Sequence, residues 1–254
     1  MTRIIINADD LGKSKEVNHA IGKALNQGVI TSSTIMANTQ LWDEIHRIVE
    51  SHAKTSFGIH LNLTEGMSLT NSPVLRQYGI TDKSNFFTGE IRKVEDLNDE
   101  LSNAIYNELA AQVDKVKNKE NIPVSHIDGH HHIHSLTPLS SIMLKVAKEN
   151  GITRIRNRYT WPHAFPHYGF SNKIKDYLWR QKFNTNGIAF TDYFGSANDI
   201  ITLLRQGRRF SPNTIIELMC HPGHIRYQEE YTLVENREIE KYINPIQYIN
   251  YLDF

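Results

Sequence analysis

Residues 125–134 contain an unusual density of side chains that bind metals or move protons. Five of the thirteen histidines lie in this stretch, together with Asp128. Apolar residues alternate with polar ones around Ile127, which predicts a short strand that runs into a loop. Because strand residues alternate between faces, His126, Asp128 and His130 are expected to share one face. Neutral imidazoles and a carboxylate that point at one place suit a divalent metal ion.

Two ordinary structures would also explain this stretch: a solvated polar loop, or histidines that form hydrogen bonds in the core. A single histidine would favour either of them, whereas five with a carboxylate favour metal binding or catalysis. The run is internal and is interrupted by Ile133, so an affinity tag is disfavoured.

Other acidic and imidazole side chains fall at the predicted carboxyl ends of strands, which converge on one mouth in a barrel. They are Asp9 and Asp10 after the apolar run 4–6, His60 in strand 57–63, and His221 at the end of strand 215–221. One carboxylate and two imidazoles would leave open metal positions for water and substrate, as in catalytic sites. The second of the two adjacent carboxylates is then free to act as a general base.

Two further side chains are candidates for the chemistry. Glu217 is expected to share a strand face with His221, and together they offer a second proton-handling pair. Arg156 is a candidate to hold Asp9 in place, with an ordinary surface ion pair as the alternative. The candidate catalytic residues are therefore Asp9, His221, Glu217 and Arg156.

The elements that must position these residues alternate between strand-like and helix-like patterns. Strands are predicted at 4–6, 29–36, 57–63, 124–130, 152–157 and 215–221, and helices at 14–28, 41–53, 95–119, 137–151 and 196–206. Residues 66–90 form a long loop, either a lid or a rim of the site. Residues 159–193 look irregular and aromatic. The pattern predicts an α/β fold with one domain over 1–254 and a largely parallel sheet, closed or nearly closed into a barrel.

Bulk composition excludes several classes of protein. The chain has 28 basic and 28 acidic residues, so no strong field attracts nucleic acid or an anionic membrane. Cys220 is the only cysteine, which excludes an intrachain disulfide and fits a cytoplasmic location. No signal peptide and no apolar run of membrane-spanning length is visible.

Four stretches resemble the signature stretches of the YdjC-type carbohydrate deacetylases. They are NADDLG at 7–12, GIHLNLTEG at 58–66, HIDGHHHIH at 126–134 and ELMCHPG at 217–223, and their order and spacing match over about 3–225. One departure is Leu11, where the family more usually has Phe.

This resemblance implies a distorted (β/α) barrel that hydrolyses N-acetyl groups of amino sugars such as chitooligosaccharides. It also implies a divalent metal, usually magnesium, and often a homodimer. By position, Asp10, His60 and His130 correspond to the metal ligands and Asp9 to the general base that takes a proton from metal-activated water. His221, oriented by Glu217, would then donate to the departing amine. Two imidazole ligands, however, favour zinc, nickel, cobalt or iron over magnesium.

Substrate contacts and rival functions stay open at this stage. Four aromatic residues could stack on a sugar or pack in a core or dimer interface, and three arginines could receive a phosphate; they are Tyr159, Trp161, Phe165 and Tyr168, and Arg154, Arg156 and Arg158. The His-x-His spacing at His130 also fits a metal-dependent amidohydrolase or a phosphoesterase acting on a small, phosphorylated sugar. A non-enzymatic metal-binding or sugar-binding protein is a further alternative.

Overall fold

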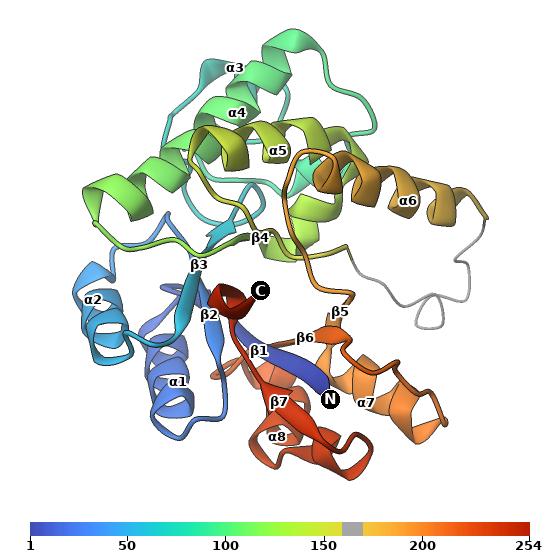
Figure 1. The fold of residues 1–254 in the computed structure, drawn as a ribbon. Coiled ribbons are helices and arrows are strands. Elements are labelled where there is room, and N and C mark those ends of the chain that lie inside the picture. Colours follow the sequence, from blue (N-terminus) through green and yellow to red (C-terminus); the bar gives the residue numbers. More distant parts are fainter. Residues whose placement is uncertain (159–169) are drawn as a thin grey trace.

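A curled parallel sheet forms the centre of the computed structural model, which describes residues 1–158 and 170–254 (Figure 1). Its strands, among the described residues, are β1 (Thr2–Leu11), β2 (Ser32–Ile35), β3 (Ser56–Leu61), β4 (Ile127–Gly129), β5 (Tyr193–Ser196), β6 (Ile215–Cys220) and β7 (Ile246–Tyr248). The hydrogen-bonded order is β4-β3-β2-β1-β6-β5, and β7 pairs with the start of β1. The predicted α/β fold with a largely parallel sheet is confirmed.

Between β4 and β5, single β-bridges take the place of a strand ladder and bring the sheet closer to a closed barrel. Ile127 of β4 pairs with Ile155, and Arg154 pairs with Ala189, whose segment leads into β5. Residues 152–157 were expected to form a regular strand, and that prediction is wrong. They form only these isolated bridges, because consecutive residues of the segment pair with different neighbours. The result is a distorted rather than an eight-fold barrel.

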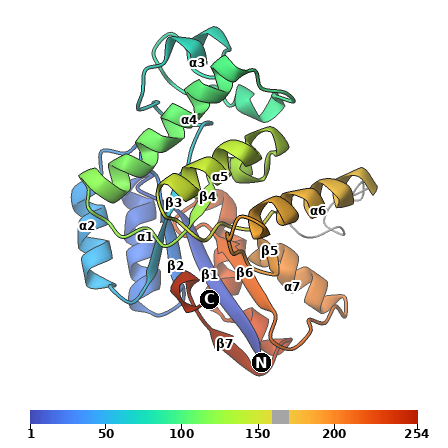
Figure 2. The same cartoon turned by 45° about the horizontal axis from the view of Figure 1, so that its top comes forward.

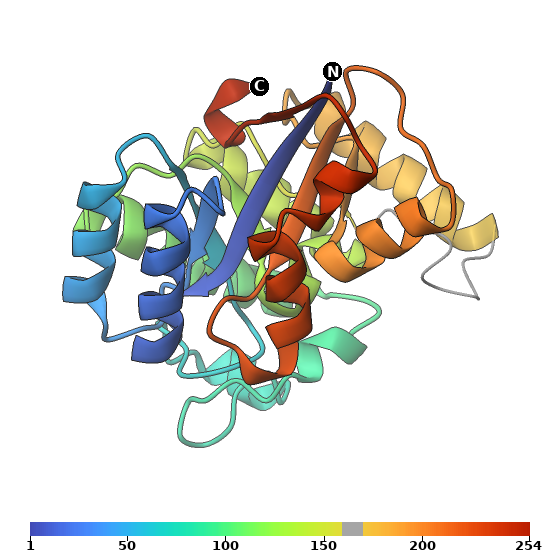
Figure 3. The same ribbon diagram turned by 90° about the horizontal axis from the view of Figure 1, so that it is seen from below.

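Helices cover the outer side of the sheet (Figures 1 and 3). They are α1 (Lys15–Asn26), α2 (Trp42–Ser51), α3 (Pro73–Gln77), α4 (Asp99–Asp114), α5 (Ser140–Glu149), α6 (Phe170–Asn184), α7 (Ala197–Arg205) and α8 (Gln228–Glu235). α1 begins where the side chain of Ser14 accepts a hydrogen bond from the Val17 amide, as expected of an N-cap. Its buried residues face β1 and form part of one continuous apolar core.

The region expected to be irregular, 159–193, contains helix α6 and the start of β5, so that prediction is wrong for its described part. The helix was missed because its apolar residues do not mark one buried stripe: Ile174, Tyr177 and Leu178 are exposed, while Trp179 and Phe183 are buried. Tyr159, Trp161, Phe165 and Tyr168 lie outside the described residues.

Residues 66–90, the rim loop, contain one short helix, α3, and two isolated antiparallel bridges (Figure 2). Glu108 of α4, which is fully buried, fastens the start of this loop. Its carboxylate accepts hydrogen bonds from Ser68 Oγ at 2.8 Å and from the amide and hydroxyl of Thr70 at 2.9 and 2.7 Å. A buried carboxylate needs such donors, so these contacts fix the start of the loop at Ser68 and Thr70.

None of the helices in the described part of the chain has the length and apolarity to span a bilayer. Both chain ends lie on the same side of the molecule (Figure 3), where the Thr2 amide donates to the Pro245 carbonyl at 3.3 Å.

Candidate functional site

A cleft of about 1160 Å³ opens at the carboxyl ends of the strands, where the predicted site residues meet. Asp9 and Asp10 lie near the carboxyl end of β1, and His60 lies in β3. His130 follows β4 in the 3₁₀-helix η3 (His130–Ser135). His221 follows β6 directly. Parallel strands that end at one edge explain why residues so far apart in sequence converge here.

Two adjacent carboxylates can face the same cleft because the end of β1 is irregular. Successive strand residues normally point to opposite faces, but the register of β1 against β2 shifts between Ala8 and Leu11. Asp10 has a left-handed backbone, with φ of 73°. Aspartate tolerates this conformation better than most residues. Both Asp9 and Asp10 are consequently buried in the site, at 2% exposure each.

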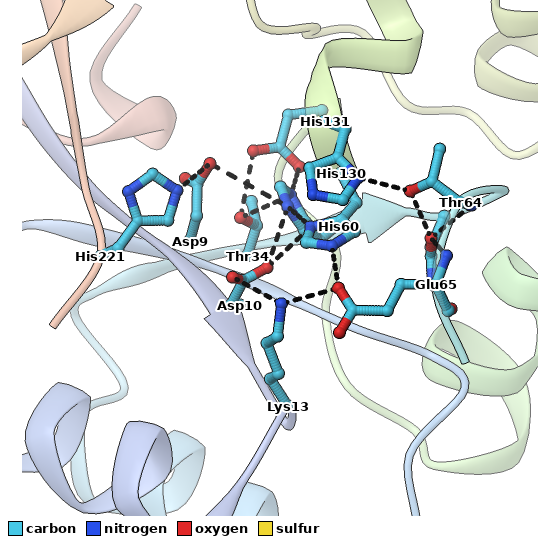
Figure 4. A network of polar contacts seen from close by, with 12 residues as sticks. Asp9, Asp10, Lys13, Thr34, His60, Thr64, Glu65, His130, His131 and His221 are labelled. Carbon is cyan, nitrogen blue, oxygen red and sulfur yellow. Dashed lines mark hydrogen bonds and ion pairs between the residues drawn. The ribbon is translucent and has the colours of Figure 1, made fainter. Parts of the chain in front are cut away.

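Three ligand atoms come together at one point: Asp10 Oδ1, His60 Nε2 and His130 Nδ1 (Figure 4). Asp10 Oδ1 lies 3.3 Å from the His60 nitrogen and 2.9 Å from the His130 nitrogen, and the two nitrogens are 3.2 Å apart. Ligands about 2.1 Å from one ion, set at right angles, lie about 3.0 Å from each other. The observed spacing therefore fits a shared metal ion.

The hydrogen bonds on the far side of each ring decide what these nitrogens offer. His60 Nδ1 donates to Asp128 Oδ1 at 2.7 Å, and His130 Nε2 donates to Glu65 Oε2 at 2.9 Å. In the neutral imidazole the other nitrogen then carries a lone pair. Two lone pairs and a carboxylate oxygen thus face one another with no proton to share, an arrangement that calls for a cation. Carboxylate partners of this kind orient metal-binding histidines.

The charges around His60 agree with this conclusion. Burial alone would lower its pKa, but the charge of Asp128 and the contacts with Asp10 and Asp9 raise the pKa of His60 to about 10. The carboxylates therefore favour a positive charge at this point, whether it is a proton or a metal ion. The chemistry of the donor set fits the divalent metal that the sequence predicts.

Asp9 is held apart from the three ligand atoms by Arg156. The guanidinium donates to both carboxylate oxygens, at 2.7 and 2.6 Å, and neither side chain is open to solvent. Burial alone would raise the pKa of Asp9, but Arg156 outweighs it and holds that pKa well below its usual value. The contact expected between Arg156 and Asp9 is confirmed, and it is a buried pair rather than a surface one. Asp9 Oδ2 lies 4.0 Å from His60 Nε2 and 4.0 Å from His221 Nε2, between the two groups.

His221 has a different carboxylate partner from the one expected. Its Nδ1 lies 3.0 Å from Glu230 Oε1 of α8, whereas Glu217 is bonded to Arg156 and to Tyr251. The prediction that Glu217 orients His221 is wrong, because residues four apart on a strand are separated by about 13 Å although they share a face. Burial alone would lower the pKa of His221, but the hydrogen bond with Glu230 and the charge of Asp9 raise it.

The remaining histidines of the central stretch have separate surroundings. His131 and His132 line the cleft, and burial lowers the pKa of His131 to about 4 and that of His132 to about 3. His134 is fully buried and donates from Nε2 to the Asn157 carbonyl at 3.2 Å. His126 stacks on Tyr251 below the site, with ring centroids 3.5 Å apart. These rings are neutral, and the last two are structural.

Several residues that the structure places at the site were not among the candidates predicted from the sequence. Glu65 holds His130 and also accepts from Lys13 Nζ at 2.8 Å, and the hydrogen bond with His130 lowers the pKa of Glu65 to about 2. His224 Nε2 lies 3.0 Å from Asp10 Oδ2. Thr34 Oγ1 donates to Asp128 Oδ2 at 3.1 Å. The signals available were the glutamate within the stretch 58–66 and a second histidine three residues after His221.

The arginines considered for phosphate binding are engaged elsewhere. Arg154 donates to the Phe254 carbonyl at 2.5 Å, Arg156 is buried among carboxylates, and Arg158 pairs with Asp176 at 3.3 Å. That alternative is therefore not supported by these three residues.

Comparison with known proteins gives a consistent result. The family model described as YdjC-like protein matches residues 3–244. A carbohydrate deacetylase of Brevibacillus brevis is 31% identical over 225 residues, which cover 88% of this chain and 82% of that protein. A carbohydrate deacetylase of Vibrio campbellii is 27% identical over 248 residues, covering 96% and 89%. A solved structure from Enterococcus faecalis V583, proposed to be a cellobiose-phosphate cleavage protein, aligns with a TM-score of 0.75 at 22% identity, over 99% of this chain and 98% of that one.

Proposed function

The chain belongs to the family of YdjC-like proteins, and on that premise we propose that it is a hydrolase that removes N-acetyl groups from amino sugars or chitooligosaccharides. The observation that carries this proposal is the convergence of Asp10, His60 and His130 on one point, with the spare carboxylate of Asp9 beside them. The names of the curated relatives support the removal of acetyl groups from a carbohydrate, and the choice of N-acetylated amino sugars rests on the resemblance of the four sequence stretches.

A divalent metal ion held by these three residues would supply a Lewis acid for the acetyl carbonyl oxygen and for water. Two imidazoles and one carboxylate suit zinc, cobalt, nickel or iron better than magnesium, which prefers oxygen ligands. We therefore propose a metal-dependent enzyme and expect a transition metal to support it best. Magnesium remains the ion that the family resemblance implies.

Asp9 takes the proton from the attacking water. Since Arg156 keeps its carboxylate ionised and fixed by two hydrogen bonds, Asp9 is available as an acceptor at neutral pH. Its Oδ2 faces both the ligand group and His221, so one carboxylate oxygen borders the place where the acetyl group must lie.

His221 protonates the departing amine. Glu230 accepts from Nδ1 and leaves Nε2 directed toward Asp9, and the raised pKa of His221 increases the fraction of the ring that carries a proton near neutral pH. A base for the attacking water and an acid for the leaving amine are the two groups that amide hydrolysis requires.

The sugar has an apolar surface to bind in the same cleft. Ile225 is 93% exposed and Tyr227 is 41% exposed, and both line the cleft beside His221. Tyr227 stacks on the His221 ring with centroids 4.3 Å apart. Arg92 and Arg226 line the cleft too and are exposed, so polar substituents of the sugar would meet them.

The test is a substrate panel with metal-loaded protein. Purified protein is reconstituted with zinc, cobalt or magnesium and incubated with N-acetylglucosamine, its dimer, their 6-phosphates and an O-acetylated sugar; acetate and phosphate are both measured. We expect acetate from an N-acetylated sugar and no phosphate. Phosphate release would favour a phosphoesterase, and tight metal uptake with no product would favour a binding protein. The homodimer stays a prediction, and the molar mass measured by sedimentation equilibrium tests it.

A further inference from the structure

The C-terminal segment Asn250–Phe254 closes the barrel at the end opposite the cleft. The Tyr251 amide donates to Ser56 Oγ at the start of β3, at 3.1 Å. The Tyr251 side chain forms a small apolar cluster with Ile5, Ile215 and Ile249 near the amino ends of the strands. The segment contains the red 3₁₀-helix beside the label C in Figure 3.

The Tyr251 side chain is fully buried and reaches into the barrel interior. Its ring lies flat on His126, with an angle of 5° between the planes. Its hydroxyl donates to Glu217 Oε2 at 2.5 Å. The phenol therefore ends on a carboxylate inside the sheet and not in solvent.

Glu217 links Tyr251 to the site through Arg156. Its other oxygen, Oε1, accepts from Arg156 Nε at 2.7 Å, and the two terminal nitrogens of Arg156 hold Asp9. Arg156 Nη1 also lies 2.8 Å from Asp128 Oδ2. Three contacts among fully or almost fully buried side chains thus join Tyr251 to Asp9.

We propose that Tyr251 is a positioning residue for the proposed general base: it fixes Glu217, which sets the direction in which Arg156 holds Asp9. The proposal rests on the proposed function, because it takes Asp9 as the base. Tyr251 lies beyond residues 3–244, the part that matches the family model, so the C-terminal segment adds a support that the family match does not include.

The charges beside Glu217 explain why its partner matters. Burial raises the pKa of Glu217 to about 7, and the charge of Arg156 and the hydrogen bond from Tyr251 keep it from rising further, while Asp128 raises it. Its register partners on β1 and β5 are Ile5 and Phe194, which are uncharged. Without the phenol hydroxyl, the pKa of Glu217 would rise, a larger fraction of the side chain would hold a proton at neutral pH, and it would bind Arg156 less firmly.

The test uses Tyr251→Phe, which keeps the ring and its stacking. We expect kcat to fall about tenfold, the effect of losing one hydrogen bond to a charged group, with KM changed by less than about twofold. The acidic limb of the pH profile should move to higher pH. Tyr248→Phe is the matched control, since the Tyr248 hydroxyl donates to the exposed Glu240 at 2.9 Å, away from the cleft.

A double-mutant cycle separates this mechanism from a general loss of stability. In a Glu217→Gln background, Tyr251→Phe should have no further effect on the pH profile. An equal tenfold loss in that background, or full activity in Tyr251→Phe, would overturn the proposal. Should Tyr251→Phe not fold, Glu217→Gln removes the charge of the group that accepts from Tyr251 and Arg156, and it should lower kcat similarly.

A second readout does not depend on deacetylation. The Nε–H group of Arg156 gives a nitrogen-15 signal whose hydrogen exchange reports how firmly Glu217 holds it; we expect exchange at least about tenfold faster in Tyr251→Phe. If the wild-type protein releases no acetate, the proposed function fails, and this signal still tests the positioning. Unchanged exchange would overturn the inference even in an active enzyme.

Discussion

Replacing Asp128 by Asn should shift His60 to the tautomer that carries its proton on Nε2, the nitrogen proposed to bind the metal ion. Asp128 accepts from His60 on one oxygen at 2.7 Å and lies 2.8 Å from an Arg156 nitrogen on the other. Arginine can only donate, so the amide oxygen of an asparagine must face Arg156 and its NH₂ group must face His60. His60 Nδ1 would then accept, and the ring proton would move to Nε2, toward Asp10 Oδ1 at 3.3 Å.

The magnitude follows from the hydrogen bonds that cannot be made. When His60 binds a metal ion through Nε2, its Nδ1 carries the proton. The variant must then either set the NH₂ group of residue 128 against this Nδ1–H group or turn the NH₂ group toward Arg156, which also only donates. Each arrangement leaves a buried polar group unsatisfied, which costs about 1–3 kcal/mol. Metal affinity should therefore fall roughly 10- to 100-fold, the range found for lost carboxylate partners of metal-binding histidines.

The measurement is a competition for zinc between the protein and a chromophoric chelator at constant pH. Asp114→Asn is the control, because Asp114 is a partly exposed aspartate on α4 that lies outside the cleft and pairs with Lys119. Circular dichroism establishes that both variants fold. Affinity of Asp128→Asn within about twofold of the wild type would refute the tautomer argument.

Four other substitutions have defined outcomes. Asp9→Asn should lower acetate release about 10²- to 10⁴-fold and leave the metal content unchanged, whereas Asp10→Asn should lose the metal; the opposite pattern, measured by elemental analysis, would exchange the two roles. Glu230→Gln removes a negative charge that raises the pKa of His221 and weakens the hydrogen bond to its Nδ1, so the ring loses its proton at lower pH and the alkaline limb of the kcat profile should move to lower pH; an unmoved limb would exclude His221 as the acid. Glu108→Gln should lower the free energy of unfolding in urea by about 1–3 kcal/mol and speed amide exchange in the rim loop, and equal exchange rates would show that the loop is held otherwise.

Strand ends were the part of the site that the sequence pattern could predict. Apolar or alternating runs before Asp10, His60 and His221 marked where strands stop, and parallel strands stop at one edge. The pattern also placed Asp128 beside the ligand imidazoles, where it bonds His60. The resemblance assigned Asp10, His60 and His130 as ligands, and their atoms do lie within reach of one point.

Partners across loops and helices could not be predicted. Glu230 of α8 takes the position beside His221 that was expected for Glu217, because a shared strand face says nothing about the distance along the strand or about what packs above it. Likewise, Glu65 and His224 reach the site from irregular segments, whose path depends on tertiary contacts such as those of Glu108 rather than on periodicity.

The left-handed backbone at Asp10 restricts how the metal preference of this protein can change. A longer or branched ligand at that position would add about 1–2 kcal/mol of backbone strain, which aspartate and asparagine largely escape. Exchange of ligand type is therefore easier at His60 and His130, which have ordinary backbone angles. Attempts to evolve an all-oxygen site should begin at the two imidazoles and retain the carboxylate on β1.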